Sequence, residues 1–103
     1  MATVIMIKTD ADDKIIDKFI SDFMTTYKTT RVFGVKPETV AKKVDIDVVK
    51  KGKHKIIKIR LDVDYIQAYI EIVRKSTEGA FKKFAKEKFN VDVNAEALIF
   101  TGL

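Results

Sequence analysis

The sequence predicts a single α+β domain over residues 1–103, with two helices packed on one face of an antiparallel sheet. Three observations predict this class. Two stretches in which apolar and polar residues alternate flank a lysine-rich turn, as in a β-hairpin. Two longer stretches carry apolar residues at helical spacing. Two short apolar stretches near the ends of the chain have the composition of strands.

The first two elements are expected to be a strand and a helix. Residues Ala2–Lys8 are apolar almost throughout, which is typical of a strand buried on both faces and therefore central in its sheet. The helix is expected from Asp10, as its N-cap, to about Lys28. Asp12 and Asp13 would then lie in the first turn, where the helix dipole favours carboxylates. The apolar stripe of this helix comprises Ile15, Ile16, Phe19, Ile20, Phe23, Met24 and Tyr27.

The segment Thr29–Ala41 fits more than one structure. Arg31–Val35 is compatible with a short strand or with an extended connection. Pro37 suits the first position of a turn or of a short helix over Glu38–Lys42. The sequence leaves these alternatives open.

A β-hairpin is expected over Lys43–Asp64. Its apolar residues share one face only if the numbers of paired residues add up to an odd value. A sum of 105 places Asp45 opposite Arg60 and Asp47 opposite Lys58, so that charges of opposite sign face each other. A sum of 103 would pair two cations instead. We therefore expect the register with the sum of 105.

The same register ends the hairpin in a tight turn. It sets Lys43 opposite Asp62 and leaves a four-residue turn, Lys51-Gly52-Lys53-His54. Gly52 can take the positive φ that such turns require. The turn therefore places basic residues at the tip of the hairpin.

A second helix and a last strand complete the chain. The helix is expected from Asp64, as its cap, to about Phe89, and Asn90 is a suitable terminator. Gly79 is a weak point that favours a bend or a break in this helix. The final strand is expected over Ala97–Thr101. The apolar stripe of the helix comprises Ile66, Ile70, Val73, Thr77, Ala80, Phe81 and Phe84, widened by Tyr69.

The resulting order of elements is β-α-β-β-α-β. Its natural arrangement is a ferredoxin-like split βαβ fold with both helices on one face of the sheet. Right-handed crossovers then give the strand order 4-1-3-2.

The composition excludes several classes of function. The chain has no cysteine, so disulfides, thiolate metal sites and cysteine nucleophiles are excluded, and His54 is the single histidine. No segment resembles a signal peptide or reaches membrane length, which predicts an intracellular, cytoplasmic protein. The net charge of +5 favours acidic partners, nucleic acid first. Few amides and many lysines and isoleucines form a thermophile-like composition, which offers a second explanation of the lysine excess.

Two groups of carboxylates are candidate metal ligands. Asp10, Asp12 and Asp13 follow the first strand, where a cluster could hold magnesium for a nuclease. Helix capping and the helix dipole explain the same residues without a metal. Charge pairing across the hairpin better explains the second group, which comprises Asp45, Asp47, Asp62 and Asp64. We therefore expect no metal, no cofactor and no catalytic residue.

The basic hairpin is the candidate binding site. A protruding hairpin of this kind can contact the phosphates of DNA or RNA. Its nucleic-acid-binding residues would be Lys50, Lys51, Lys53, His54, Lys55 and Lys58. A second basic group late in the second helix comprises Lys82, Lys83, Lys86 and Lys88. Ordinary solvation explains both groups as well, and the hairpin lacks the aromatic residues on which single strands stack.

The first and last strands indicate an interface. Neither alternates, so each must point apolar side chains away from the helices. These would be Val4 and Met6, or Ile5 and Ile7, together with Leu98 and Phe100, or Ile99. Exposed apolar patches of this kind usually mark an interface, here most simply that of a homodimer. The alternative is that Thr29–Ala41 covers the patch.

The sequence thus predicts a small basic non-enzymatic module, a homodimer that binds nucleic acid through its lysine-rich hairpin. The main alternative is a structural or protein-interaction homo-oligomer without a nucleic-acid ligand. A further alternative is a metal-dependent nuclease that uses Asp10, Asp12 and Asp13. No membrane partner is expected.

Overall fold

The computed structural model describes residues 2–26, 43–65 and 67–103. Over these residues the chain forms four strands and two helices in the predicted order, β-α-β-β-α-β. The elements are β1 (Thr3–Thr9), α1 (Asp13–Thr26), β2 (Val44–Lys51), β3 (His54–Leu61), α2 (Gln67–Phe89) and β4 (Ala95–Phe100). The alternatives for Thr29–Ala41 and the expected helix end at Lys28 lie outside the described residues.

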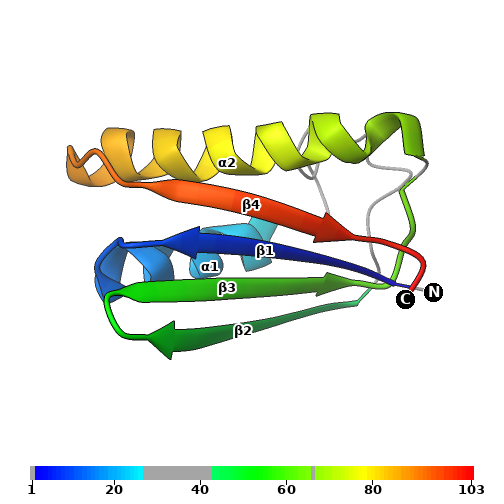
Figure 1. Ribbon diagram of the computed structural model, residues 1–103. Helices are drawn as coiled ribbons and strands as arrows, with labels where there is room; N and C mark the ends of the chain where they lie inside the picture. The colour runs from blue at the N-terminus through cyan, green and yellow to red at the C-terminus, as the bar shows by residue number, and fades with distance from the viewer. Residues whose placement is uncertain (1, 27–42, 66) are drawn as a thin grey trace.

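The four strands form one antiparallel sheet in the order β2-β3-β1-β4, which confirms the predicted order 4-1-3-2. In Figure 1 the sheet faces the viewer, α1 lies behind it, and α2 runs beside β4. The fold is therefore the α+β ferredoxin-like split arrangement. β1 is central, as its composition predicts, and β2 and β4 are the two edges of the sheet.

The register of the hairpin is the predicted one. Asp45 lies opposite Arg60, and Asp47 lies opposite Lys58. The strands extend to Lys51 and His54, so Gly52 and Lys53 form the two central residues of the predicted four-residue turn. A φ of 62° at Gly52, with no positive φ at Lys53, is the pattern of a type II′ turn. This turn suits the right-handed twist of the two strands.

The hydrophobic core lies between the sheet and the two helices. Alternate residues of β1 and β3, among them Ile5 and Ile59, are fully buried there. Phe19 of α1 contacts Phe81 of α2 edge to face, with ring centroids 4.9 Å apart. Two buried threonines of β1 have hydrogen-bond partners: Thr3 donates to the Val63 carbonyl and Thr9 to the Asn94 carbonyl, both at 2.7 Å. Buried polar groups on this face are therefore satisfied.

β1 is not covered on both faces. Val4 and Met6 point away from the helices and are partly buried, and Lys8 is exposed. The prediction of a strand buried on both faces is therefore wrong for this second face. No described helix lies over this outward side, so the strand is central without being covered on both faces.

The first helix begins later than predicted. The Asp12 carbonyl accepts hydrogen bonds from the N–H groups of Ile15 and Ile16, which is the position of an N-cap residue. Asp10 is not the cap, because its carboxylate accepts two hydrogen bonds from Asn94 at 3.0 Å. Asp10 therefore connects the end of β1 to the start of β4.

The second helix also departs from its predicted start. It begins at Gln67, and the Asp64 carboxylate accepts a hydrogen bond from the Gly102 N–H at 3.1 Å, so Asp64 is not its cap. The helix continues through Gly79 without a break. Asn90 terminates it with a φ of 55° while its N–H donates to the Lys86 carbonyl, as in a helix C-cap.

The buried face of α2 is narrower than predicted. Its buried residues are Val73, Thr77, Phe81 and Ala85. Ala80 and Tyr69 are exposed, although the predicted stripe includes both. The predicted stripe was therefore too wide, because only residues facing the sheet and α1 are covered. β4 begins two residues before its predicted start and remains the last strand.

Candidate interaction surfaces

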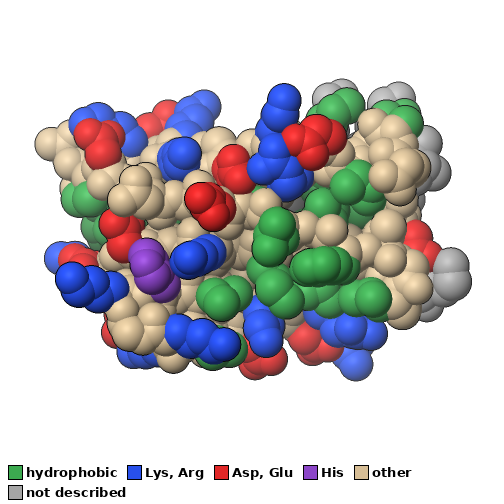
Figure 2. All heavy atoms as spheres, in the orientation of Figure 1, with side chains coloured by type: hydrophobic (Ala, Val, Ile, Leu, Met, Phe, Trp, Pro, Cys, Tyr) green, Lys and Arg blue, Asp and Glu red, His purple; other side chains and the backbone are tan. Residues whose placement is uncertain are grey.

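The face of the sheet opposite the helices is here called the open face. The cross-strand register arranges its side chains in stripes along the strands. The outer stripe on β2 is acidic, with Asp45 and Asp47, and the next stripe on β3 is basic, with Lys58 and Arg60. The remaining two strands contribute apolar side chains. Figure 2 shows these hydrophobic side chains gathered over the sheet, with charged side chains along the border.

The apolar strip comprises Val4, Met6, Leu98 and Phe100. Val4 pairs with Phe100 and Met6 pairs with Leu98, so the four side chains are neighbours across β1 and β4. Leu98 is 58% exposed and Phe100 is 47% exposed. The sequence allows either Val4 and Met6 or Ile5 and Ile7 as the outward side chains of β1. The structure shows that they are Val4 and Met6, because Ile5 and Ile7 point into the core.

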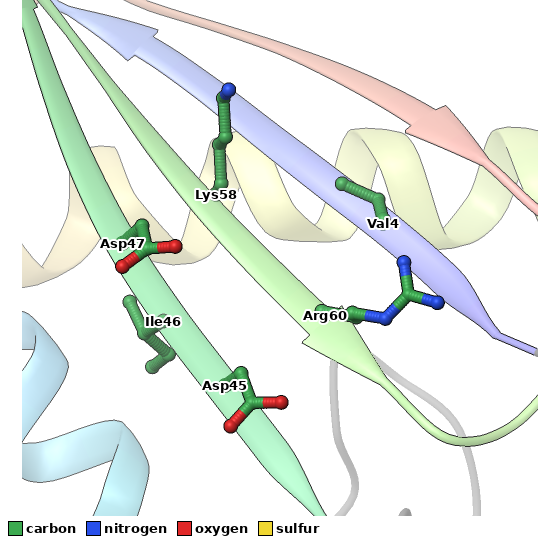
Figure 3. A pocket seen from close by; sticks show the side chains of 6 residues that line it. All are labelled: Val4, Asp45, Ile46, Asp47, Lys58 and Arg60. Carbon is green, nitrogen blue, oxygen red and sulfur yellow. The ribbon is translucent and has the colours of Figure 1, made fainter.

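A hollow of about 490 Å³ lies beside the apolar strip. It is lined by two carboxylates of β2 and two cations of β3, together with Val4 and Ile46. In Figure 3 Arg60 extends from β3 toward β1, and the carboxylates of Asp45 and Asp47 lie on the β2 side. These opposite charges are cross-strand neighbours, as the register predicts, but they do not close into ion pairs. They therefore remain able to contact a charged partner.

Strand alternation divides the predicted nucleic-acid site. Lys50 and Lys55 lie on the helix side of the hairpin, and both form ion pairs with Asp13, at 2.9 and 3.4 Å. The Lys55 ammonium also donates to the Ala11 carbonyl. Two of the six predicted residues thus hold the hairpin against the start of α1.

The hydrogen bond from Lys50 lowers the pKa of Asp13, and Asp13 in turn raises the pKa of Lys50. A lowered carboxyl pKa stabilises the fold above the pKa of a free aspartate, and this contribution is lost as the pH falls through the lowered value. Both groups are exposed, so the effect is small.

The other four predicted residues lie elsewhere on the hairpin. Lys51, Lys53 and His54 are exposed at the tip, and Lys58 lies in the basic stripe opposite Asp47. No hydrogen bond or ion pair within the described chain engages the side chains of Lys51 and Lys53. The tip therefore offers a smaller group of cations than the sequence suggests.

His54 faces a polar hollow of about 240 Å³ that also includes Lys8, Asp10 and Glu96. Asn94 lowers the pKa of Asp10, chiefly through its backbone N–H and also through its side chain, and the charge of His54 lowers it further. The sequence reasoning missed Lys8 and Glu96, because only the pairing of β1 with both β3 and β4 brings them beside the hairpin tip.

The three aspartates of the nuclease alternative serve separate structural roles. Asp10 binds Asn94, the Asp12 carbonyl accepts the first bonds of α1, and Asp13 binds two lysines. Among the described residues, no group of three histidine, cysteine or acidic side chains could hold a metal ion.

The second basic group lies along the last turns of α2. Lys82, Lys83, Lys86 and Lys88 are all exposed there. Lys83 forms an ion pair with Glu87, and Lys86 forms one with Asp92, each at 3.8 Å. This group is separate from the hairpin tip.

Comparison with protein-family models, with curated proteins and with solved structures finds no match for this chain. In the part of the chain that the structure describes, no helix has the length and apolar character needed to cross a membrane.

Proposed function

We propose that this protein is a non-enzymatic module that acts by self-association, as a homo-oligomer joined through the apolar strip of the open face. The observation that carries the proposal is the exposure of Leu98 and Phe100 beside Val4 and Met6, on a face that no described helix covers. Exposed apolar side chains that cluster in this way usually form an interface. The charged stripes of β2 and β3 lie beside the strip, so the apolar strip is confined to β1 and β4.

The order of the stripes allows two copies to pack face to face. If a two-fold axis runs parallel to the strands between β1 and β4, then β1 of one copy lies over β4 of its partner. Val4 and Met6 then cover Phe100 and Leu98 of the partner subunit, at the spacing of two packed sheets, about 10 Å. The charged stripes of β2 and β3 stay outside the contact, so their side chains remain hydrated.

A double substitution tests the apolar strip. Leu98→Glu with Phe100→Glu places charges in the contact, and we expect the average mass in light scattering to fall. Ile72→Glu is the matched control, because Ile72 is 55% exposed on α2, close to the 58% of Leu98, but lies outside the strip. The control should keep the wild-type mass. A wild type that is monomeric throughout the micromolar range would contradict the proposal.

A second candidate function is nucleic-acid binding at the hairpin tip. The observation that favours it is the exposure of Lys51, Lys53 and His54 at one end of the sheet. RNA-binding sheets of related topology stack bases on aromatic residues of their central strands, and this open face has no aromatic residue on β1 or β3. Contact with the phosphates of a duplex therefore fits the tip better than stacking.

A gel shift over a salt series tests this second candidate. We expect binding of duplex DNA or RNA at low salt that weakens steeply as salt rises. Lys51→Ala with Lys53→Ala should reduce it several-fold, whereas Lys82→Ala with Lys83→Ala, an equal loss of charge on α2, should reduce it less. Equal losses in the two double variants would remove the hairpin tip as the site.

A further inference from the structure

The two edges of the sheet differ in how their backbone groups are satisfied. On β4, the outward N–H of Ala97 donates to the Glu78 carboxylate at 2.7 Å. Arg74 holds Glu78 in place through an ion pair at 2.9 Å. α2 also runs beside this edge (Figure 1). The β4 edge is thus closed to another strand, which is a common protection of natural sheets.

The β2 edge has no such cover among the described residues. Lys51 and His54 flank the two-residue turn and form a hydrogen-bonded pair, so the odd-numbered residues of β2 direct their backbone groups toward β3. Lys43 also has an odd number, and its N–H likewise points to the β3 side, where it donates to the Asp62 carboxylate. The N–H and C=O groups of Ile46, Val48 and Lys50 therefore point outward.

β2 has the composition of a strand that can pair. Its sequence, VDIDVVKK, has eight residues with no proline or glycine, and half of them are β-branched. Val48 is 37% exposed on this edge. The acidic residues occupy the first half of the strand and the basic residues the second half. An antiparallel copy of the strand therefore brings opposite charges together.

The register of such a pair can be derived. Two copies keep their open faces on the same side only if paired residue numbers add up to an even value. A sum of 94 would set Asp47 against the partner's Asp47, and a sum of 100 would set Lys50 against the partner's Lys50. A sum of 96 instead sets Asp45 against the partner's Lys51 at both ends, with Val48 against the partner's Val48 on the two-fold axis. A sum of 98 also gives an opposite-charge pair but matches fewer residues.

We propose that β2 pairs in antiparallel fashion with β2 of a second copy in the register with the sum of 96, joining two four-stranded sheets into one continuous sheet. In this register the outward N–H and C=O groups of Val48 bond to those of the partner's Val48. Those of Ile46 bond to the partner's Lys50, and those of Lys50 bond to the partner's Ile46. The pairing is independent of the apolar strip. Together the two contacts would build assemblies larger than a dimer.

Charge reversal tests the pairing in a background that lacks the strip contact, Leu98→Glu with Phe100→Glu. That background is expected to be a dimer. Asp45→Lys or Lys51→Asp added to it sets like charges at both ends of the pair, so each is expected to give a monomer. Mixed in equal amounts, these two variants restore opposite charges at both ends, and native mass spectrometry should detect the heterodimer.

Lys53→Asp is the matched control for charge, because it makes the same charge change in the turn, outside the paired residues. It should leave the dimer intact. A background that is monomeric at submillimolar concentration overturns the edge proposal, as do charge variants that stay dimeric. Neither result bears on the apolar strip. That contact is tested separately, by comparing the mass of the wild type with the masses of the background and of the Ile72→Glu control.

Two further measurements do not depend on charge. Val48→Pro removes an outward N–H while keeping the bonds between β2 and β3, and edge strands tolerate such prolines. It should convert the background dimer into a folded monomer, and a dimer of unchanged stability overturns the proposal. In the background protein itself, the amide protons of Ile46, Val48 and Lys50 should exchange more slowly at high than at low concentration. Exchange that is independent of concentration also overturns it.

Discussion

The two faces of the sheet differ in what they contribute, although the same strands form both. On the helix-covered face, Ile5, Ile57 and Ile59 are fully buried, and the buried threonines are hydrogen-bonded. On the open face, Leu98 and Phe100 are about half exposed. Side chains that follow one another in the chain therefore belong to different environments. The covered face accounts for stability, whereas no described helix covers the open face.

The largest expected effect comes from comparing two neighbours on β3. Ile59→Ala removes a fully buried side chain from the core and should lower the free energy of unfolding by about 2–5 kcal/mol. Arg60→Ala changes a side chain of the open face and should alter the free energy of unfolding by about 0.5 kcal/mol or less. Denaturant unfolding of both variants measures the difference. Equal losses would show that the open face also contributes to stability.

The next effect concerns Tyr65, which is buried on the covered side. Burial raises the pKa of Tyr65 to about 12, above the value of about 10 for a free tyrosine. Its contribution is therefore fully present below pH 10 and is lost as the pH rises toward 12. Relative to Tyr65→Phe, the wild type should lose about 2 kcal/mol across this interval. Parallel stability curves for the two proteins would show that Tyr65 ionises as freely in the fold as in the unfolded chain.

The smallest expected effect lies on the solvent side of α2. An added Cβ at Gly79 would meet no atom within 4 Å, and the helix is continuous there. Gly79→Ala should therefore raise the free energy of unfolding by about 1 kcal/mol through helix propensity alone. Thermal unfolding measures it as a higher midpoint. A lower midpoint would mean that α2 depends on the flexibility of this glycine.

Much of the fold could be predicted because its signals are local and periodic. The register of the hairpin follows from the alternation of Asp45 and Asp47 with apolar residues and from the charges they face. The helix starts could not be predicted in this way. Asp10 and Asp64 have the right chemistry for caps. Their carboxylates instead accept hydrogen bonds from residues 84 and 38 positions away in the chain. Local chemistry cannot reveal such distant donors.

The candidate sites, like the fold, could be predicted only where local signals define them. The apolar strip could be anticipated, although only the register between β1 and β4 selects Val4 and Met6 over Ile5 and Ile7. The six residues of the basic hairpin form one group in the sequence. In the structure, Asp13 of α1 binds Lys50 and Lys55, which leaves the tip with fewer cations.

By itself the sequence determined the order of the elements, the hairpin register and the central position of β1, because apolar periodicity and cross-strand charge act between near neighbours. Only the tertiary structure decided which face of β1 is covered and which sheet edge is closed. Both depend on where the helices lie: together they cover one face of the sheet, and Glu78 of α2 accepts a hydrogen bond from the Ala97 N–H at the β4 edge. β2, at the far edge, is left with outward backbone groups that no described residue satisfies.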